Sequence, residues 1–185
     1  MRHLLLSLWL CLSLLSSTKA AENDYAFSPT NNTRIESAFS PDAGGEQLVL
    51  KVIDAARRSL YVAAYSFTSA NVARALIRAK RRGVDVKVLV DESANQRKAN
   101  FAALNLLVNA DIPTRTIASY TLHHDKYIVV DGKTVQTGSF NYSAAAAKSN
   151  SENVLVVWNH AQLARRYLQH WEDRWGQADV YQSVY

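Results

Sequence analysis

The alternation of helix-forming and strand-forming segments between residues 45 and 175 constrains the fold of this 185-residue chain most strongly. Runs rich in β-branched and aromatic residues alternate with runs whose apolar residues recur at helical spacing. Such alternation predicts an α/β fold, with a mixed, mainly parallel sheet flanked by helices on both faces. The segment 29–41 and the last ten residues are expected to be irregular. The expected strands are 25–28, 60–67, 84–91, 112–116 and 153–158, and the expected helices are 45–57, 69–82, 99–109, 143–148 and 161–175.

A β-hairpin is expected where Asp131-Gly132 separates two β-rich runs, 127–130 and 133–137. Asp-Gly is a strong signal for a two-residue turn, because both turn positions require positive φ angles that these residues tolerate. By alternation, the side chain of Asp131 points away from the strand face that carries His124. We therefore expect Asp131 to have a structural role in the turn.

Four polar side chains are expected to converge beside this hairpin. His124 and Lys126 lie two residues apart and therefore on the same face of a strand. The hairpin would bring Ser139 and Asn141 back alongside them. The imidazole can act as a nucleophile or as an acid and base, and the ammonium provides a fixed positive charge for an anionic substrate. This combination predicts a site that handles phosphate.

Each of these residues also has a plainer interpretation. A lone histidine on an apolar strand is usually a hydrogen-bonded core residue, but burying Lys126 beside it without an anionic ligand would be costly. We therefore favour a catalytic role for His124 and a phosphate-binding role for Lys126. Ser139 and Asn141 have turn-forming interpretations of their own.

The pattern H-x-K-x4-D followed by G-S-x-N resembles the signature of the phospholipase D superfamily. Glu152 stands at an acidic position that this family carries downstream of the signature. Within the superfamily, the chain is most similar to small bacterial exported endonucleases that have a single motif copy. The positions that match the signature are His124, Lys126, Asp131, Gly138, Ser139 and Asn141.

The resemblance implies a role for each of these positions. The expected catalytic residues are His124, Lys126 and Glu152. Glu152 would accept a hydrogen bond from a catalytic imidazole and fix its tautomer, as the third group of a triad does. The expected phosphate-binding residues are Lys126, Ser139 and Asn141, and the expected structural motif positions are Asp131 and Gly138. No cofactor is expected, and the sequence has no carboxylate cluster, H-E-x-x-H motif or cysteine pair that would predict a metal site.

The function that the resemblance implies is a metal-independent phosphodiesterase, and most specifically a non-specific DNA endonuclease with a phosphohistidine intermediate. Phosphodiester cleavage needs a nucleophile and a proton donor for the leaving oxygen, whereas one motif copy supplies one histidine. A homodimer in which both copies of His124 meet at a shared site would supply both groups. RNA as a second substrate stays open.

Two other functions are also open. One is a phospholipase D-type hydrolase or transferase, which would apply the same chemistry to phospholipid head groups. The sequence shows no amphipathic helix with exposed large apolar residues for docking to a membrane. The other is a non-catalytic nucleic-acid-binding module, which the intact His124 and Lys126 disfavour.

The first 20 residues have the layout of a secretory signal peptide, with a basic start, an apolar run over residues 4–15 and small residues before a cut after Ala20. The expected domains are therefore a signal peptide at 1–20 and a nuclease domain at 21–185. An uncleaved anchor is the alternative, although the apolar run is short for a transmembrane helix. We expect export to the periplasm or the medium, with no stable membrane association after cleavage.

Cleavage after Ala20 would also change the charge and the cysteine content of the chain. It removes Arg2 and Lys19 but no acidic residue, so the formal net charge falls from +5 to +3. It also removes Cys11, the one cysteine in the sequence. A modest positive charge suits a polyanionic substrate, although it is also common in other proteins.

Overall fold

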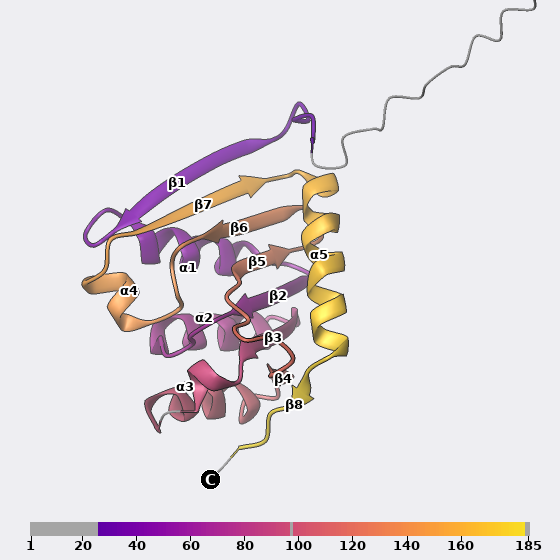
Figure 1. Ribbon diagram of the computed structural model, residues 1–185. Coiled ribbons are helices and arrows are strands. Elements are labelled where there is room, and N and C mark those ends of the chain that lie inside the picture. Colours follow the sequence, from indigo (N-terminus) through magenta and orange to yellow (C-terminus); the bar gives the residue numbers. More distant parts are fainter. Residues whose placement is uncertain (1–25, 97, 184–185) are drawn as a thin grey trace, which may run out of the picture.

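The computed structural model describes residues 26–96 and 98–183, which form one eight-stranded sheet with helices on both faces (Figure 1). The expected signal peptide, residues 1–20, lies outside the described residues. The strands are β1 (Arg34–Ser40), β2 (Ser59–Ala64), β3 (Asp85–Asp91), β4 (Thr114–Ile117), β5 (Lys126–Val130), β6 (Thr134–Gly138), β7 (Glu152–Trp158) and β8 (Asp179–Val180). The helices are α1 (Gly45–Ala55), α2 (Ala70–Arg81), α3 (Lys98–Val108), α4 (Ala144–Lys148) and α5 (Ala161–Gly176), with a short 3₁₀ turn η1 at Ser93–Asn95.

The strand order across the sheet is β1-β7-β6-β5-β2-β3-β4-β8. The expected α/β architecture with a mixed sheet is confirmed, but the expectation of a mainly parallel sheet is wrong. Among the described strands, the β2–β3 and β3–β4 pairings are parallel and the other pairings are antiparallel. The reason is that strand–helix–strand crossovers, which produce parallel pairs, end at β4. The remaining strands pair antiparallel because the chain reverses direction between the paired strands, as it does in the hairpin of β5 and β6.

Both edge strands were missed by the sequence analysis. β1 lies in the segment that was expected to be irregular, while residues 26–28 of the expected strand 25–28 are not in a strand. β1 alternates Ile35, Ser37 and Phe39 on one face with Glu36 and Ala38 on the other, but its polar residues weaken the hydrophobic pattern. β8 is two residues long and pairs with β4, so it carries almost no periodic signal.

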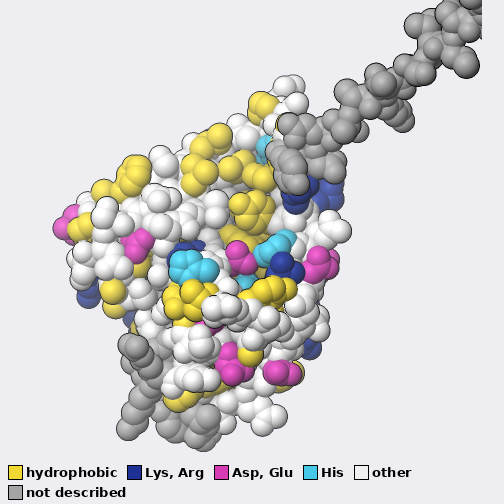
Figure 2. Space-filling view, in the orientation of Figure 1, with side chains coloured by type: hydrophobic (Ala, Val, Ile, Leu, Met, Phe, Trp, Pro, Cys, Tyr) yellow, Lys and Arg dark blue, Asp and Glu magenta, His cyan; other side chains and the backbone are white. Residues whose placement is uncertain are grey.

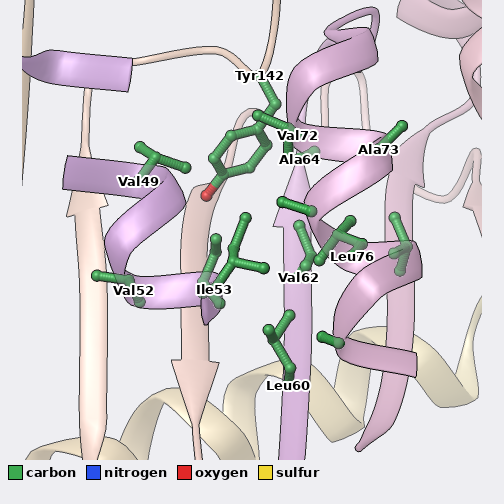
Figure 3. Close-up of a cluster of buried hydrophobic side chains, with 14 of the residues drawn as sticks. Val49, Val52, Ile53, Leu60, Val62, Ala64, Val72, Ala73, Leu76 and Tyr142 are labelled. Atoms are coloured by element: carbon green, nitrogen blue, oxygen red, sulfur yellow. The ribbon is translucent and has the colours of Figure 1, made fainter. Parts of the chain in front are cut away.

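The larger core lies between the sheet and helices α1, α2 and α3. Figure 3 shows side chains of α1, β2 and α2 packed against one another, with the Tyr142 ring among them. Both α1 and α2 were predicted from their helical spacing, and each turns its buried residues toward the sheet. The labelled core residues are Val49, Val52, Ile53, Leu60, Val62, Ala64, Val72, Ala73, Leu76 and Tyr142.

Helix α5 covers part of the opposite face of the sheet (Figure 1). The buried Trp171 ring stacks on Tyr61 with centroids 4.8 Å apart and on Trp175 with centroids 4.7 Å apart. Its Nε1 donates a 2.9 Å hydrogen bond to the backbone oxygen of Val62 in β2. These contacts fix the orientation of α5 on the sheet, and they thereby place its side chains beside the end of β5.

The same face is left open over β1 and β7. Ile35 is 63% exposed, Phe39 is 57% exposed and Leu155 is 37% exposed. Figure 2 shows hydrophobic side chains gathered over this part of the sheet. Apolar patches on the surface of a soluble domain often mark an interaction site.

Candidate catalytic site

The expected hairpin is present and brings the motif residues together. Asp131 and Gly132 have φ angles of 54° and 65°, as the predicted two-residue turn requires. The pairing of β5 with β6 aligns Tyr127 with Thr137, so the ends of the two strands lie side by side. Lys126 is the first residue of β5, and His124 lies two residues before it. A cavity of about 450 Å³ at this end is lined by His124, Lys126, Gly138, Ser139, Asn141 and Glu152.

Lys126 is the most constrained member of the group. Its side chain is largely buried, and its ammonium donates a 2.8 Å hydrogen bond to the backbone oxygen of His124. The ammonium Nζ also lies 3.2 Å from His124 Nδ1. Burial lowers the pKa of Lys126, and the negative charges of Asp125 and Glu152 act against that shift. A buried cation held beside an imidazole is suited to bind a phosphate.

An aromatic ring completes the surroundings of His124. The Tyr65 ring lies 4.6 Å from the His124 ring, centroid to centroid, with the two planes tilted by 54°. The Lys126 ammonium lies 5.3 Å from the centroid of the same Tyr65 ring. Tyr65 therefore restricts both motif side chains, because each of them packs against it.

Glu152 and Ser139 bond to each other within this cavity. Ser139 Oγ donates a 2.5 Å hydrogen bond to Glu152 Oε2, and Asn150 Nδ2 donates a 3.0 Å hydrogen bond to Glu152 Oε1. These are the hydrogen-bond partners of Glu152 in the described part of the chain, so the expected contact with a His124 ring is not made within one chain. Asn141 Oδ1 is buried and has no hydrogen-bond partner among the described residues.

Gly138 allows the strands beside the cavity to approach closely. Its φ is 149°, a value that L side chains rarely adopt. A Cβ added at this position would lie 2.2 Å from the backbone oxygen of Asn153 in β7. A glycine is therefore required here for β6 and β7 to meet as they do.

Asp131 lies at the tip of the hairpin, away from the cavity. Its carboxylate accepts hydrogen bonds from the backbone N–H groups of Arg57, Arg58 and Ser59, the shortest being 2.7 Å from the nitrogen of Arg58. These bonds give hydrogen-bond acceptors to the backbone N–H groups just before β2 and at its start. Asp131 thus bonds to the backbone next to β2 and does not line the cavity, and its structural role stays a prediction.

Two buried polar residues near the site were not identified from the sequence. Asp91, at the end of β3, accepts hydrogen bonds of 2.7 Å from Ser93 Oγ, from the backbone N–H of Ala94 and from that of His123. Asn95 Nδ2 donates to the backbone oxygens of Tyr65 and Asp91 at 2.7 Å and 2.6 Å. The sequence offered one signal for Asp91, because this polar residue ends a buried parallel strand and α/β proteins bind ligands at such strand ends.

A second cavity lies on the other side of His124 and Lys126, against α5. Its volume is also about 450 Å³, and α5 contributes Arg166, Tyr167 and His170 to its lining. None of these three residues was predicted as part of the site. Figure 2 shows histidine side chains beside acidic and basic ones in the middle of this face.

Neither a metal cluster nor a membrane-spanning helix occurs in the described ranges. Within residues 26–96 and 98–183, no group of three or more His, Cys, Asp or Glu side chains is placed to hold a metal ion. In the same ranges, no helix combines the length and the apolar character needed to span a bilayer.

Comparisons with known proteins link this site to a family. The sequence model of a protein family described as "Cardiolipin synthase, PLD-like domain" matches residues 49–175. This range includes every residue of the first cavity. The phospholipase D of Rickettsia bellii is 39% identical over 150 residues, covering 81% of this chain and 73% of the relative. The mitochondrial cardiolipin hydrolase of Xenopus laevis is 31% identical over 164 residues, covering 83% of this chain and 76% of the relative. The crystal structure of Nuc from Salmonella typhimurium, a phospholipase D family member, is 46% identical with a TM-score of 0.81, covering 82% of this chain and 99% of that structure.

Proposed function

The chain belongs to the phospholipase D superfamily of phosphodiesterases, and on that premise we propose that it is an endonuclease that hydrolyses DNA without a metal ion. The observation that carries this proposal is the first cavity, in which His124 and Lys126 meet Ser139 and Asn141. The imidazole is the nucleophile, and the ammonium and amide bind the non-bridging phosphate oxygens.

The reaction has two steps. In the first, neutral His124 attacks phosphorus, a phosphohistidine forms, and the bond to the leaving oxygen breaks as His124 of the partner subunit donates its proton to that oxygen. In the second, His124 of the partner subunit, now neutral, takes a proton from water as the water oxygen attacks phosphorus. The nitrogen–phosphorus bond breaks, and both imidazoles return to their starting states.

A homodimer is required because each chain supplies one such histidine. The exposed apolar face over β1 and β7 is the surface that we assign to the dimer interface. It is continuous with the cavity, since Phe39 pairs with Asn153, the neighbour of Glu152 in β7. A second copy packed on this face by a two-fold axis brings the two cavities together. The expected bond between Glu152 and a His124 ring then forms across the interface, because within one chain Ser139 and Asn150 hold that carboxylate.

Hydrolysis or transfer of phospholipid head groups is the second candidate function. The names of two relatives support it, namely phospholipase D at 39% identity and mitochondrial cardiolipin hydrolase at 31% identity. The chemistry at His124 would be the same, and the substrates would differ in what surrounds the phosphate.

The test is digestion of plasmid DNA in excess chelator by the wild type, a His124→Ala variant and an Arg165→Gln variant as a surface control. We expect cleavage by the wild type and by Arg165→Gln, and none by His124→Ala. The same preparations are assayed in parallel on phosphatidylcholine vesicles. Cleavage of the lipid with intact plasmid would favour the second function, and loss of cleavage on chelation would contradict the metal-independent mechanism.

The dimer has its own test. Mixed dimers of wild-type and His124→Ala chains contain one histidine per shared site and should lack full activity. A monomer that sediments as a single chain and cleaves DNA at the full rate would contradict a shared site.

Export is the remaining part of the proposal. Residues 1–20 act as a cleaved signal peptide that directs residues 21–185 to the periplasm or the medium. Cell fractionation with N-terminal sequencing of the exported protein tests this, with a mature chain that begins at Ala21 as the expected result.

A further inference from the structure

The second cavity, which we call the α5 hollow, adjoins the catalytic cavity. Its own lining residues are Asp125, Tyr127, Thr137, Arg166, Tyr167 and His170, and it shares His124, Lys126 and Gly138 with the catalytic cavity. A molecule bound at His124 therefore has room on two sides. One side is lined by Ser139 and Asn141, and the other is formed by α5.

We propose that the α5 hollow binds the phosphate next to the scissile phosphate in a polynucleotide strand, and that Arg166 and His170 recognise it. This inference rests on the endonuclease function proposed above and names a further part of its substrate site. Arg166 and His170 lie four residues apart on α5 and therefore on the same face of the helix. A guanidinium offers a planar pair of donors that matches two phosphate oxygens.

The hydrogen bonding of His170 prepares one ring nitrogen for such a ligand. His170 Nδ1 lies 2.9 Å from the Tyr127 hydroxyl. Burial raises the pKa of Tyr127 far above its ordinary value, so the phenol stays protonated and is able to donate to Nδ1. In the tautomer in which Nδ1 accepts this hydrogen bond, Nε2 carries the ring hydrogen. It lies 3.8 Å from Asp125 Oδ2, which is longer than a hydrogen bond, so it can donate to a phosphate oxygen.

Asp125 is the one acidic residue in the lining of the hollow. Its Oδ2 lies between two imidazoles, 3.5 Å from His123 Nδ1 and 3.8 Å from His170 Nε2. The positive charges of Lys126 and Arg166, which line the same hollow, offset its negative charge. A phosphate is therefore accepted at the Arg166 side of the hollow.

The lining favours a polynucleotide over a phospholipid. Every nucleotide inside a strand has a phosphate on each side, whereas phosphatidylcholine has a single phosphate and would leave the hollow without its ligand. The described lining contains no aliphatic side chain larger than that of Thr137, so it offers little contact to acyl chains. The aromatic ring of Tyr167 lines the hollow and can pack against a sugar or a base.

The test compares an oligonucleotide with bis(p-nitrophenyl) phosphate, a diester that has one phosphate. Arg166→Gln and His170→Gln are measured against Arg165→Gln, which changes the neighbouring exposed arginine that does not line the hollow. A charge-assisted hydrogen bond to phosphate corresponds to roughly a tenfold or larger effect. We therefore expect Arg166→Gln to raise KM for the oligonucleotide by about tenfold relative to its effect on the small diester. The salt dependence of log KM should also fall by about 0.7 for the lost phosphate contact.

Several outcomes overturn the proposal. An equal effect of Arg166→Gln on both substrates would mean that Arg166 supports the catalytic cavity and not a second phosphate. An equal effect of Arg165→Gln and Arg166→Gln would mean diffuse attraction by α5. A selective effect on cardiolipin vesicles, whose lipid has two phosphates, would assign the hollow to a lipid. A wild type that cleaves no oligonucleotide would instead remove the endonuclease function, and the polynucleotide subsite with it.

Discussion

The backbone N–H of His123 donates a 2.7 Å hydrogen bond to Asp91 Oδ2 and thereby ties the residue before His124 to the end of β3. The same strand end is bonded to Asn95, whose amide holds the backbone of Tyr65. Two elements that meet at the site, the loop with His124 and the segment with Tyr65, thus share one buried anchor. Catalysis depends steeply on such positioning, since a displacement of ~1 Å costs roughly a hundredfold in rate.

Replacement of Asp91 by asparagine should lower turnover much more than substrate affinity. The amide keeps the size of the side chain but has one oxygen, so it cannot accept from both His123 and the η1 turn. We expect kcat to fall by about tenfold to a hundredfold with KM nearly unchanged. Asp85→Asn, at the exposed start of β3, is the matched control and should retain kcat. If the loss of activity merely followed the unfolded fraction in thermal melts, Asp91 would be a stability residue only.

Gly138→Ala should be strongly destabilising. The new Cβ would lie 2.2 Å from the backbone oxygen of Asn153, and backbone cannot move aside as a flexible side chain can. We expect a loss of about 3 kcal/mol or more in the free energy of unfolding, measured by urea denaturation. Gly176→Ala, where nothing lies within 4 Å, should change the same quantity by less than about 1 kcal/mol. Equal stability of the two variants would contradict the close approach of β6 and β7.

The grouping of His124, Lys126, Ser139 and Asn141 could be predicted from the sequence because one hairpin brings these residues together. Asp131-Gly132 fixes the turn, and strand periodicity then places His124 and Lys126 opposite the segment that begins with Ser139. The sheet was less predictable. Its parallel part follows from alternating strands and helices, but β1 joins the sheet through pairing with β7, more than a hundred residues later in the chain. Local pattern carries no information on such a contact.

The residues missed at the site act through contacts that only the fold creates. Asp91 and Asn95 bond to backbone groups of distant segments as well as to neighbouring residues, and no sequence motif encodes the distant backbone partners. Arg166 and His170 lie on the polar side of an amphipathic helix, where charged residues are usually solvated. Arg166 and His170 line the same cavity as Lys126 because Trp171 packs against Tyr61, and this packing sets how α5 is rotated on the sheet.

His123 should make the protein sensitive to acid. Burial lowers the pKa of His123 in the folded state, and the charges of Asp125 and Asp91 oppose that shift without cancelling it. As the pH falls below the ordinary histidine value of about 6.5, the unfolded chain binds a proton that the folded chain does not, and the free energy of unfolding falls. The slope from this residue is at most about 1.4 kcal/mol per pH unit.

His123→Gln should therefore flatten the dependence of unfolding free energy on pH between about 7 and 5. Urea denaturation of the wild type and the variant at several pH values measures this slope. At pH 8 both chains carry an uncharged side chain at this position, so the difference in stability there gives the packing effect alone. Parallel pH profiles of the two proteins would show that His123 takes up no extra proton on unfolding.

Glu152→Gln should reduce turnover and shift the pH profile while leaving substrate binding nearly unchanged. Paired imidazoles need one neutral and one protonated member, so the rate is bell-shaped in pH, and its two limbs belong to the pair. The carboxylate stabilises a nearby positive charge, and its charge also acts against the burial that lowers the pKa of Lys126. Without the Glu152 carboxylate, the protonated imidazole of the pair and the Lys126 ammonium both lose their protons at lower pH. The alkaline limb should therefore move to lower pH, with kcat reduced by about a hundredfold.

Glu172→Gln, an exposed change on α5, is the control and should retain the wild-type profile. Wild-type turnover with an unshifted alkaline limb in Glu152→Gln would leave this carboxylate with the single task of holding Ser139 in place.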